Sequence, residues 1–271
     1  MGSTTRLWRA LGLTTLGCTL LLAFGFGWAL RDTYAPTKGM ALPEPSAPPQ
    51  ATGGSWAGKK EILAAAAGDS LTRGTGDATG NGYVRDTVSQ LQQALGKPVR
   101  LLNNLGVNGQ TTDELLKLLD TTGYKSELGQ ADLILLTIGA NDLFRIATGS
   151  GSIAEGGDVS LEKVRARMPE AERRLQAVLV KLRKINPYAR IVYVGLYNPF
   201  YDVKEMRAAS GDIQKWNAYA QSLALRDGNA TVVPTYDLFE ANIGRYLSSD
   251  HFHPNADGYR RIAERIVQAL R

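Results

Sequence analysis

From Lys59 onward, short apolar runs alternate with amphipathic segments, and this alternation limits the folds open to the chain. The apolar runs have the length and composition of buried strands, and they are residues 61–67, 99–104, 131–140, 190–196 and 230–236. The segments with helical periodicity are residues 83–95, 111–120, 161–185 (with Pro169 as a candidate break), 212–226 and 254–270. Strands buried on both faces and separated by helices predict an α/β fold, a three-layer α/β/α sandwich around a central parallel sheet of about five strands.

An uncharged segment, residues 10–30, precedes this domain. A helix of that length can cross a hydrocarbon core of about 30 Å, so we predict a single-pass transmembrane anchor. Arg6 and Arg9 precede the segment, and the charges directly after it cancel. The excess of positive charge therefore predicts that residues 1–9 are cytoplasmic and that the domain is extracytoplasmic, at the cell membrane. The alternative is a cleaved signal peptide, which would make the protein secreted.

The stretch between this segment and the domain, residues 31–58, is rich in Pro, Ala, Gly and Ser. Such a composition has little to bury and predicts an extended linker. The folded domain is therefore expected over residues 59–271.

Cysteine content and charge exclude several classes of protein. Cys18 is the only cysteine, which rules out an intramolecular disulfide and a multi-cysteine zinc site, although a lipoprotein signal at this residue is a further alternative. The formal net charge is +5 and is spread along the chain. No stripe of Lys and Arg with interleaved aromatic residues occurs, so no nucleic-acid partner is expected.

The residues that follow the strands are the candidates for a site, because ligands bind outside the carboxyl ends of parallel strands. Ser70 follows the first strand, and a serine hydroxyl needs a base to become a nucleophile. The chain has two histidines, His251 and His253. Asp250 lies three residues before His253, and in a helical turn that spacing puts both on one face, whereas His251 points elsewhere. We therefore predict Ser70 as nucleophile, His253 as base and Asp250 as the carboxylate that orients it.

A tetrahedral intermediate also needs hydrogen-bond donors for its oxyanion. The backbone N–H groups of Ser70 and Gly106 and the side-chain amide of Asn141 are the predicted donors, since a glycine lets the backbone approach a ligand closely. Asp69 and Asp142 are expected to have structural roles. A metal site at His251 and His253 is not expected, because no further histidine or cysteine is available to complete it, and no cofactor is required.

Four blocks of sequence carry a resemblance to a known family: "GDSLTRG" (68–74), "NLGVNGQTT" (104–112), "IGAND" (138–142) and "DHFHP" (250–254). In this order they resemble the SGNH hydrolases, the GDSL esterase/lipase family, over about residues 60–270. The second block is similar to that of bacterial extracellular members. The resemblance implies a flavodoxin-like SGNH hydrolase fold and assigns the same catalytic and oxyanion roles to the matching positions.

These observations together predict a membrane-tethered serine esterase or lipase that forms an acyl-enzyme. Its substrate would be an acyl ester, a lipid or an O-acetylated glycan. The alternatives are a polysaccharide or cell-wall O-deacetylase of the same family and, in another class, a catalytically silent membrane-tethered binding module. The glycine-rich residues 74–82 are interpreted as a flexible loop beside the nucleophile, because they miss the dinucleotide fingerprint by one residue. Residues 147–160 are either a flap over the acyl site or a surface insertion.

Overall fold

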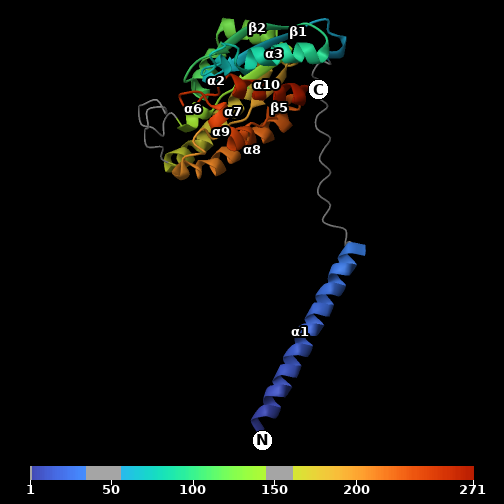
Figure 1. The fold of residues 1–271 in the computed structure, drawn as a ribbon. Coiled ribbons are helices and arrows are strands. Elements are labelled where there is room, and N and C mark those ends of the chain that lie inside the picture. Colours follow the sequence, from blue (N-terminus) through green and yellow to red (C-terminus); the bar gives the residue numbers. More distant parts are fainter. Residues whose placement is uncertain (1, 35–55, 145–160) are drawn as a thin grey trace. The chain divides into compact units, whose positions relative to one another are not determined.

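Five parallel strands form the sheet at the centre of the domain (Figure 1). They are β1 (Ile62–Gly68), β2 (Val99–Gly106), β3 (Leu133–Thr137), β4 (Arg190–Val194) and β5 (Ala230–Val233). Their order across the sheet is β2-β1-β3-β4-β5, and every neighbouring pair is parallel. The chain thus runs from β1 outward to β2 and then returns to β3 on the other side of β1. The carboxyl ends of β1 and β3 flank this reversal of strand order, which is where open α/β sheets form binding sites.

Helices cover both faces of the sheet. The longer ones are α3 (Gly82–Leu95), α4 (Thr112–Leu118), α5 (Thr122–Gly129), α7 (Leu161–Ile185), α8 (Ala209–Asp227), α9 (Tyr236–Tyr246) and α10 (Ala256–Leu270). Two short helices follow strands, namely α2 (Ser70–Arg73) and α6 (Ala140–Phe144), and single 3-10 turns are η1 (Trp56–Gly58) and η3 (Lys204–Met206).

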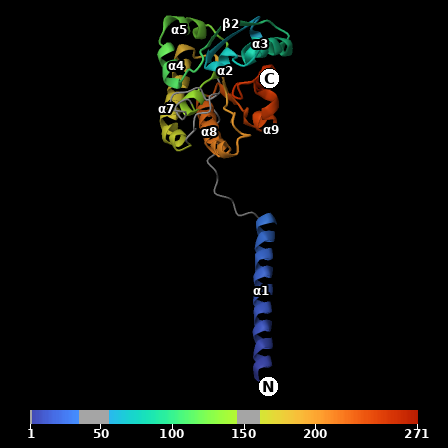
Figure 2. The ribbon, with the colours of Figure 1, turned by 60° about the vertical axis from the view of Figure 1, so that its left-hand side comes forward.

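Alternate residues of the strands point to opposite faces of the sheet and contribute to two separate hydrophobic cores. One face of the sheet packs against α4, α5, α7 and α8, and the other face packs against α3, α9 and α10. Figure 2 shows α4, α5 and α7 on one side of the domain and α3 and α9 on the other. This arrangement confirms the predicted three-layer α/β/α sandwich.

The computed structural model describes residues 2–34, 56–144 and 161–271. The chain divides into two units, residues 1–47 and 48–271. The first unit contains α1 (Gly2–Tyr34), in which Leu11–Arg31 is long and apolar enough to cross a membrane. Most of the predicted linker lies outside the described residues, and so do residues 147–160, the segment interpreted as either a flap or a surface insertion.

Two helices differ from their predictions at a proline. Helix α7 continues through Pro169, which lies on its exposed side, because buried residues such as Met168 and Ala171 hold the helix against the core on both sides of the proline. The last helix does not start at Pro254. Asn255 caps it by accepting a hydrogen bond from Gly258 N at 3.0 Å, and Pro254 pairs with Leu247 outside the helix.

Candidate active site

Ser70 is the first residue of α2, two residues after the end of β1, and it is only 5% exposed. The residue before it, Asp69, caps α2 by accepting a hydrogen bond from Leu71 N at 3.1 Å. This short turn places the serine hydroxyl at the carboxyl end of β1, beside the reversal of strand order.

The three predicted catalytic side chains form one connected row. His253 Nε2 lies 2.8 Å from Ser70 Oγ, and His253 Nδ1 lies 2.6 Å from Asp250 Oδ2. Both distances are within hydrogen-bonding range. If Nδ1 carries the proton and donates it to Asp250, then Nε2 can accept the proton of the serine hydroxyl.

Asp250 and His253 meet through a turn that differs from the predicted helical one. Asp250 Oδ1 accepts hydrogen bonds from the backbone N–H groups of Phe252 and His253, each at 2.9 Å, and from Ser248 Oγ at 2.7 Å. His251 has a φ of 53°, in the left-handed region, which folds the chain back on itself. The prediction of a helical turn is therefore wrong, although the two side chains do pair.

Opposing effects set the ionisation of Asp250. Burial alone would raise the pKa of Asp250, but the hydrogen bonds from Ser248, His253 and Phe252 outweigh it and lower the pKa to about 2. The carboxylate is therefore charged over the ordinary range of pH. A charged group at 2.6 Å from Nδ1 stabilises the imidazolium that a base forms when it takes up a proton.

The second histidine lies outside this row. The His251 side chain is exposed, and its backbone N–H donates to Ser248 O at 3.0 Å. Among the residues that the structure describes, no group of three or more His, Cys, Asp or Glu side chains is arranged to hold a metal ion.

Gly106, one of the predicted oxyanion donors, has a packing role. Its N–H donates to Asn104 Oδ1 at 3.0 Å, and Asn104 Nδ2 donates to Thr72 O at 2.7 Å. A Cβ on Gly106 would lie 2.4 Å from Arg73 N, so a glycine is needed for α2 to pack against β2. To serve an oxyanion, the Gly106 N–H would have to give up its bond to Asn104.

Asn141, the predicted side-chain donor, lies in α6 beyond the end of β3. Its Nδ2 donates to Gln110 O at 3.0 Å. An amide carries two N–H groups, so this bond still leaves one for a ligand. The bond also shows that the turn from Val107 to Gln110, which follows β2, lies beside Asn141.

A buried polar network lies beneath Ser70, and its threonines were not among the predicted site residues. Thr137 Oγ1 donates to Asp69 Oδ1 at 2.6 Å and lies 2.6 Å from Thr72 Oγ1, which in turn lies 3.0 Å from the Tyr83 hydroxyl. Burial raises the pKa of Asp69, while its hydrogen bonds from Thr137 and Leu71 act in the opposite direction. The one sign of this network in the sequence is Thr137, a polar residue at the end of the apolar strand β3. These bonds fix the turn that carries Ser70.

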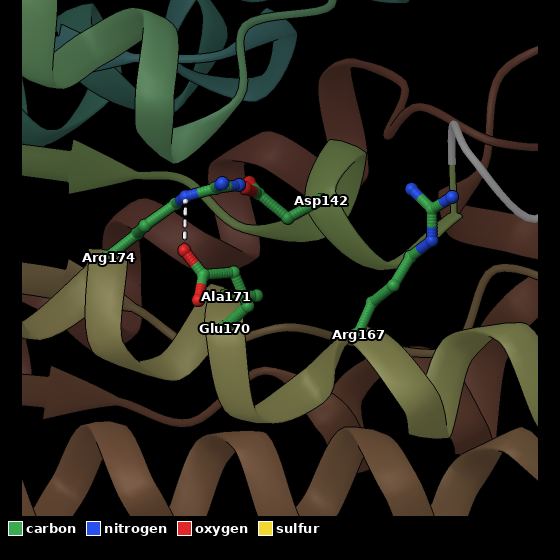
Figure 3. A pocket seen from close by; sticks show the side chains of 5 residues that line it. All are labelled: Asp142, Arg167, Glu170, Ala171 and Arg174. Atoms are coloured by element: carbon green, nitrogen blue, oxygen red, sulfur yellow. Dashed lines mark ion pairs between the residues drawn. The ribbon is translucent and has the colours of Figure 1, made fainter.

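Asp142 holds α4 in place, as expected for a structural carboxylate. It accepts hydrogen bonds from Thr112 N at 2.9 Å and Thr112 Oγ1 at 2.6 Å, and it is 4% exposed. Figure 3 shows it at a cavity of about 160 Å³ between α6 and α7, where the Arg174 side chain extends between Glu170 and Asp142. Arg174 Nε is 3.1 Å from Glu170 Oε1, so charges of opposite sign largely balance there.

The glycine-rich loop, residues 74–82, is tied to its surroundings, which corrects its interpretation as a flexible loop. Thr75 O accepts a hydrogen bond from the Tyr259 hydroxyl at 2.7 Å, and Thr75 Oγ1 donates to Asn108 Oδ1 at 2.8 Å. Gly76 packs directly against the base, because a Cβ there would lie 2.8 Å from His253 Cβ. The loop therefore forms part of the wall that positions His253.

Comparison with known proteins assigns the chain to a family. Residues 66–261 match the model of the GDSL-like lipase/acylhydrolase family. The chain is 32% identical to the uncharacterized protein YpmR of Bacillus subtilis over 79% of this chain and 83% of that protein. It is 29% identical to the spore germination lipase LipC of Bacillus licheniformis over 75% of this chain and 94% of that protein. The crystal structure of the lipase Lip_vut3, from a goat rumen metagenome, superposes with a TM-score of 0.63 at 25% identity, over 77% of this chain and 97% of that one. The chain thus belongs to the GDSL-like lipase/acylhydrolase family and is a carboxylic ester hydrolase.

Proposed function

We propose that the protein is a serine esterase that acts through an acyl-enzyme, with Ser70 as nucleophile, His253 as base and Asp250 as the orienting carboxylate. The observation that carries the proposal is the row of two contacts, 2.8 Å from Ser70 Oγ to His253 Nε2 and 2.6 Å from His253 Nδ1 to Asp250 Oδ2. The same row argues against a catalytically silent binding module.

Ser70, His253 and Asp250 together supply the groups that each step of ester hydrolysis needs. Ser70 Oγ attacks the ester carbonyl carbon while its proton passes to His253 Nε2. The tetrahedral intermediate collapses, and the same proton goes to the departing alcohol, which leaves the acyl group on Ser70. Water then attacks the acyl carbon as His253 takes one of its protons, and His253 returns this proton to Ser70 Oγ as the bond from the acyl carbon to Oγ breaks and the carboxylic acid is released. Asp250 stabilises the imidazolium in both halves of the reaction.

The oxyanion of the intermediate is proposed to bind the Ser70 N–H and the Asn141 amide, with a backbone N–H from β2 or the turn after it. Gly106 is the predicted backbone donor, but its N–H is bonded to Asn104. Gly106 remains the proposed backbone donor, and its N–H is proposed to exchange the bond to Asn104 for one to the oxyanion.

A substitution of the nucleophile tests the function. Purified full-length Ser70→Ala should lose turnover of p-nitrophenyl acetate by roughly 10⁴-fold or more and should not react with a fluorophosphonate, which labels activated serines. Ser249→Ala is the matched control, because this serine is exposed in the same turn as the histidines. Turnover by Ser70→Ala at the wild-type rate would refute the proposed role.

The N-terminal helix α1 is proposed to anchor the enzyme in the cell membrane. In this arrangement residues 1–9 are cytoplasmic, residues 10–30 span the bilayer, and residues 31–58 tether an extracytoplasmic domain of residues 59–271. The length and apolar composition of Leu11–Arg31 support the proposal. A cleaved signal peptide is the alternative that an experiment must distinguish.

The names of similar proteins do not distinguish an acyl-ester substrate from an O-acetylated glycan, because solved structures of similar fold include a family 3 carbohydrate esterase and an acetyl xylan esterase as well as lipases. LipC is called a spore germination lipase, and Lip_vut3 is called a lipase. Their names describe those proteins, and for this chain the preference between acyl esters and glycans is itself part of the proposal.

A further inference from the structure

Three phenylalanines form a row that leads from the proposed base to the helix that carries Asn141. The Phe252 ring packs edge-on against the His253 ring, with centroids 4.9 Å apart and an angle of 86° between the planes. Phe200 follows at 6.0 Å from Phe252, and Phe144 at 6.2 Å from Phe200. Phe144 lies in α6, three residues after Asn141. The aromatic row therefore connects the two sides of the proposed site.

The backbone that carries the aromatic row is fixed by hydrogen bonds. The Tyr197 hydroxyl donates to Phe252 O at 2.7 Å. Phe200 N donates to Asn198 Oδ1 at 3.0 Å, and the buried Asn198 amide donates to Met206 O at 3.1 Å. The rings of Phe200 and Phe252 are therefore held in place while part of their surface stays accessible.

We infer that the aromatic row binds the apolar acyl group of the ester and that the enzyme prefers medium-length acyl chains to acetyl. This inference rests on the proposed function. In that mechanism His253 gives a proton to the departing alcohol and Asn141 binds the carbonyl oxygen, so the ester carbon lies between these two residues. The aromatic row spans the same interval. An acyl chain would cover the exposed part of the rings, whereas an acetyl methyl group would leave it in water.

The packing of the rings favours an acyl chain over a sugar. A site that binds a sugar usually offers the exposed face of an aromatic ring, on which the sugar stacks, with hydrogen-bonding side chains around it. Here Phe200 meets Phe252 at 40° and Phe144 at 74°, and Phe144 is only 1% exposed. Such a row offers an apolar, partly buried surface with tilted rings in place of a flat platform.

Phe200 gives the sharpest test, because it packs on the two other phenylalanines. Full-length wild type should have a kcat/KM for p-nitrophenyl octanoate at least about tenfold above that for the acetate. Phe200→Ala should lower this octanoate-to-acetate ratio about tenfold, and Phe200→Leu, which keeps an apolar side chain, should keep most of it. Tyr188→Ala is the control, since this aromatic side chain is 72% exposed and precedes β4, at the amino ends of the strands and away from the proposed site.

The two proposals fail in different ways. Suppose that wild type hydrolyses the acetate, shows no preference for the octanoate, and has the same octanoate-to-acetate ratio as Phe200→Ala. This result would overturn the chain-length inference and leave the proposed function intact. Wild type that hydrolyses no ester and resists fluorophosphonate would overturn both. A second readout needs no variant: an octyl fluorophosphonate should inactivate wild type faster than its methyl analogue, and equal rates would contradict the inference.

Discussion

At the scale of single residues, the two oxygens of Asp250 have separate tasks. Oδ1 accepts three hydrogen bonds that build the turn, and Oδ2 contacts the imidazole of His253. One side chain thus shapes the backbone around the base and also orients its ring. Substitutions at this position should therefore affect both catalysis and the response of the fold to pH.

Asp250→Asn should lower kcat by roughly 10²–10⁴-fold, because an amide cannot stabilise the imidazolium and can favour the wrong tautomer of His253. Steady-state kinetics with p-nitrophenyl acetate measure the effect. Asp257→Asn in α10 is the control, since this carboxylate pairs with Arg260 on the surface. An unchanged kcat in Asp250→Asn would rule out the orienting role.

The acid stability of the wild type should depend on the same carboxylate. The folded-state pKa of Asp250 is lowered to about 2, so its stabilising effect is present above its ordinary pKa of about 4 and is lost as the pH falls from about 4 to about 2. The Tm of wild type should therefore fall more steeply over this window than the Tm of Asp250→Asn. Parallel curves of Tm against pH would contradict this.

Gly76→Ala should impair catalysis by moving the base. The new Cβ would lie 2.8 Å from His253 Cβ and 2.6 Å from Pro254 O, so these atoms must shift. A displaced catalytic group lowers kcat by up to about 10²-fold. Gly80→Ala is a matched control, because its φ of 74° is also positive but nothing lies within 4 Å of its Cβ. Equal losses of kcat in the two variants would attribute the effect to backbone strain.

At the scale of elements, β1 and β3 support the nucleophile together. Thr137, the last residue of β3, donates to Asp69 and accepts from Thr72 N at 3.0 Å. These bonds join the turn after β1 to the neighbouring strand. The position of Ser70 therefore depends on the side chain of Thr137, which lies far along the chain from the GDSL block.

Thr137→Val should destabilise the domain by about 1–3 kcal/mol, because it removes a buried hydroxyl and leaves its partners without their bonds. Urea unfolding followed by circular dichroism measures the change. Thr231→Val in β5 is the control, since no side-chain hydrogen bond of Thr231 occurs in the described part of the chain. A loss of stability no larger than in that control would show that the network contributes little.

The five strands and most of the helices were predictable from their apolar patterns. β3 reads as a continuous apolar run because all five of its residues are buried. In contrast, α9 was missed, since the non-helical backbone at Asn242 interrupts its periodicity. The start of α10 was misplaced by two residues, because Pro254 suits a helix start but Asn255 supplies the capping oxygen.

The predicted site residues were recognisable because four short blocks carry them, but the geometry between them was not. Sequence spacing suggested a helical turn at Asp250, whereas the positive φ of His251 sets the real one. Nothing in the block "NLGVNGQTT" reveals that the Gly106 N–H is already bonded to Asn104. Such pairings depend on how α2 packs on β2, which only the folded chain determines.

At the scale of the whole molecule, the anchor can be tested separately from the chemistry. Full-length protein should stay in the membrane fraction after alkaline carbonate extraction, because about twenty apolar residues suffice for a stable transmembrane helix. A variant that lacks residues 1–30 should not. Recovery of a soluble protein whose N-terminal sequence begins after residue 30 would instead establish a cleaved signal peptide.

The distance in sequence between Ser70 and His253, 183 residues, has a consequence for biosynthesis. A ribosome synthesises the proposed nucleophile early and the proposed base much later. A chain halted before residue 250 therefore carries a serine with no partner to deprotonate it. In the proposed mechanism, ester hydrolysis therefore needs the C-terminal part of the domain in its folded place, where α10 packs against α3 and the Tyr259 hydroxyl donates to Thr75 O. Under that mechanism, the onset of hydrolytic activity reports that the newly made domain has brought its two ends together.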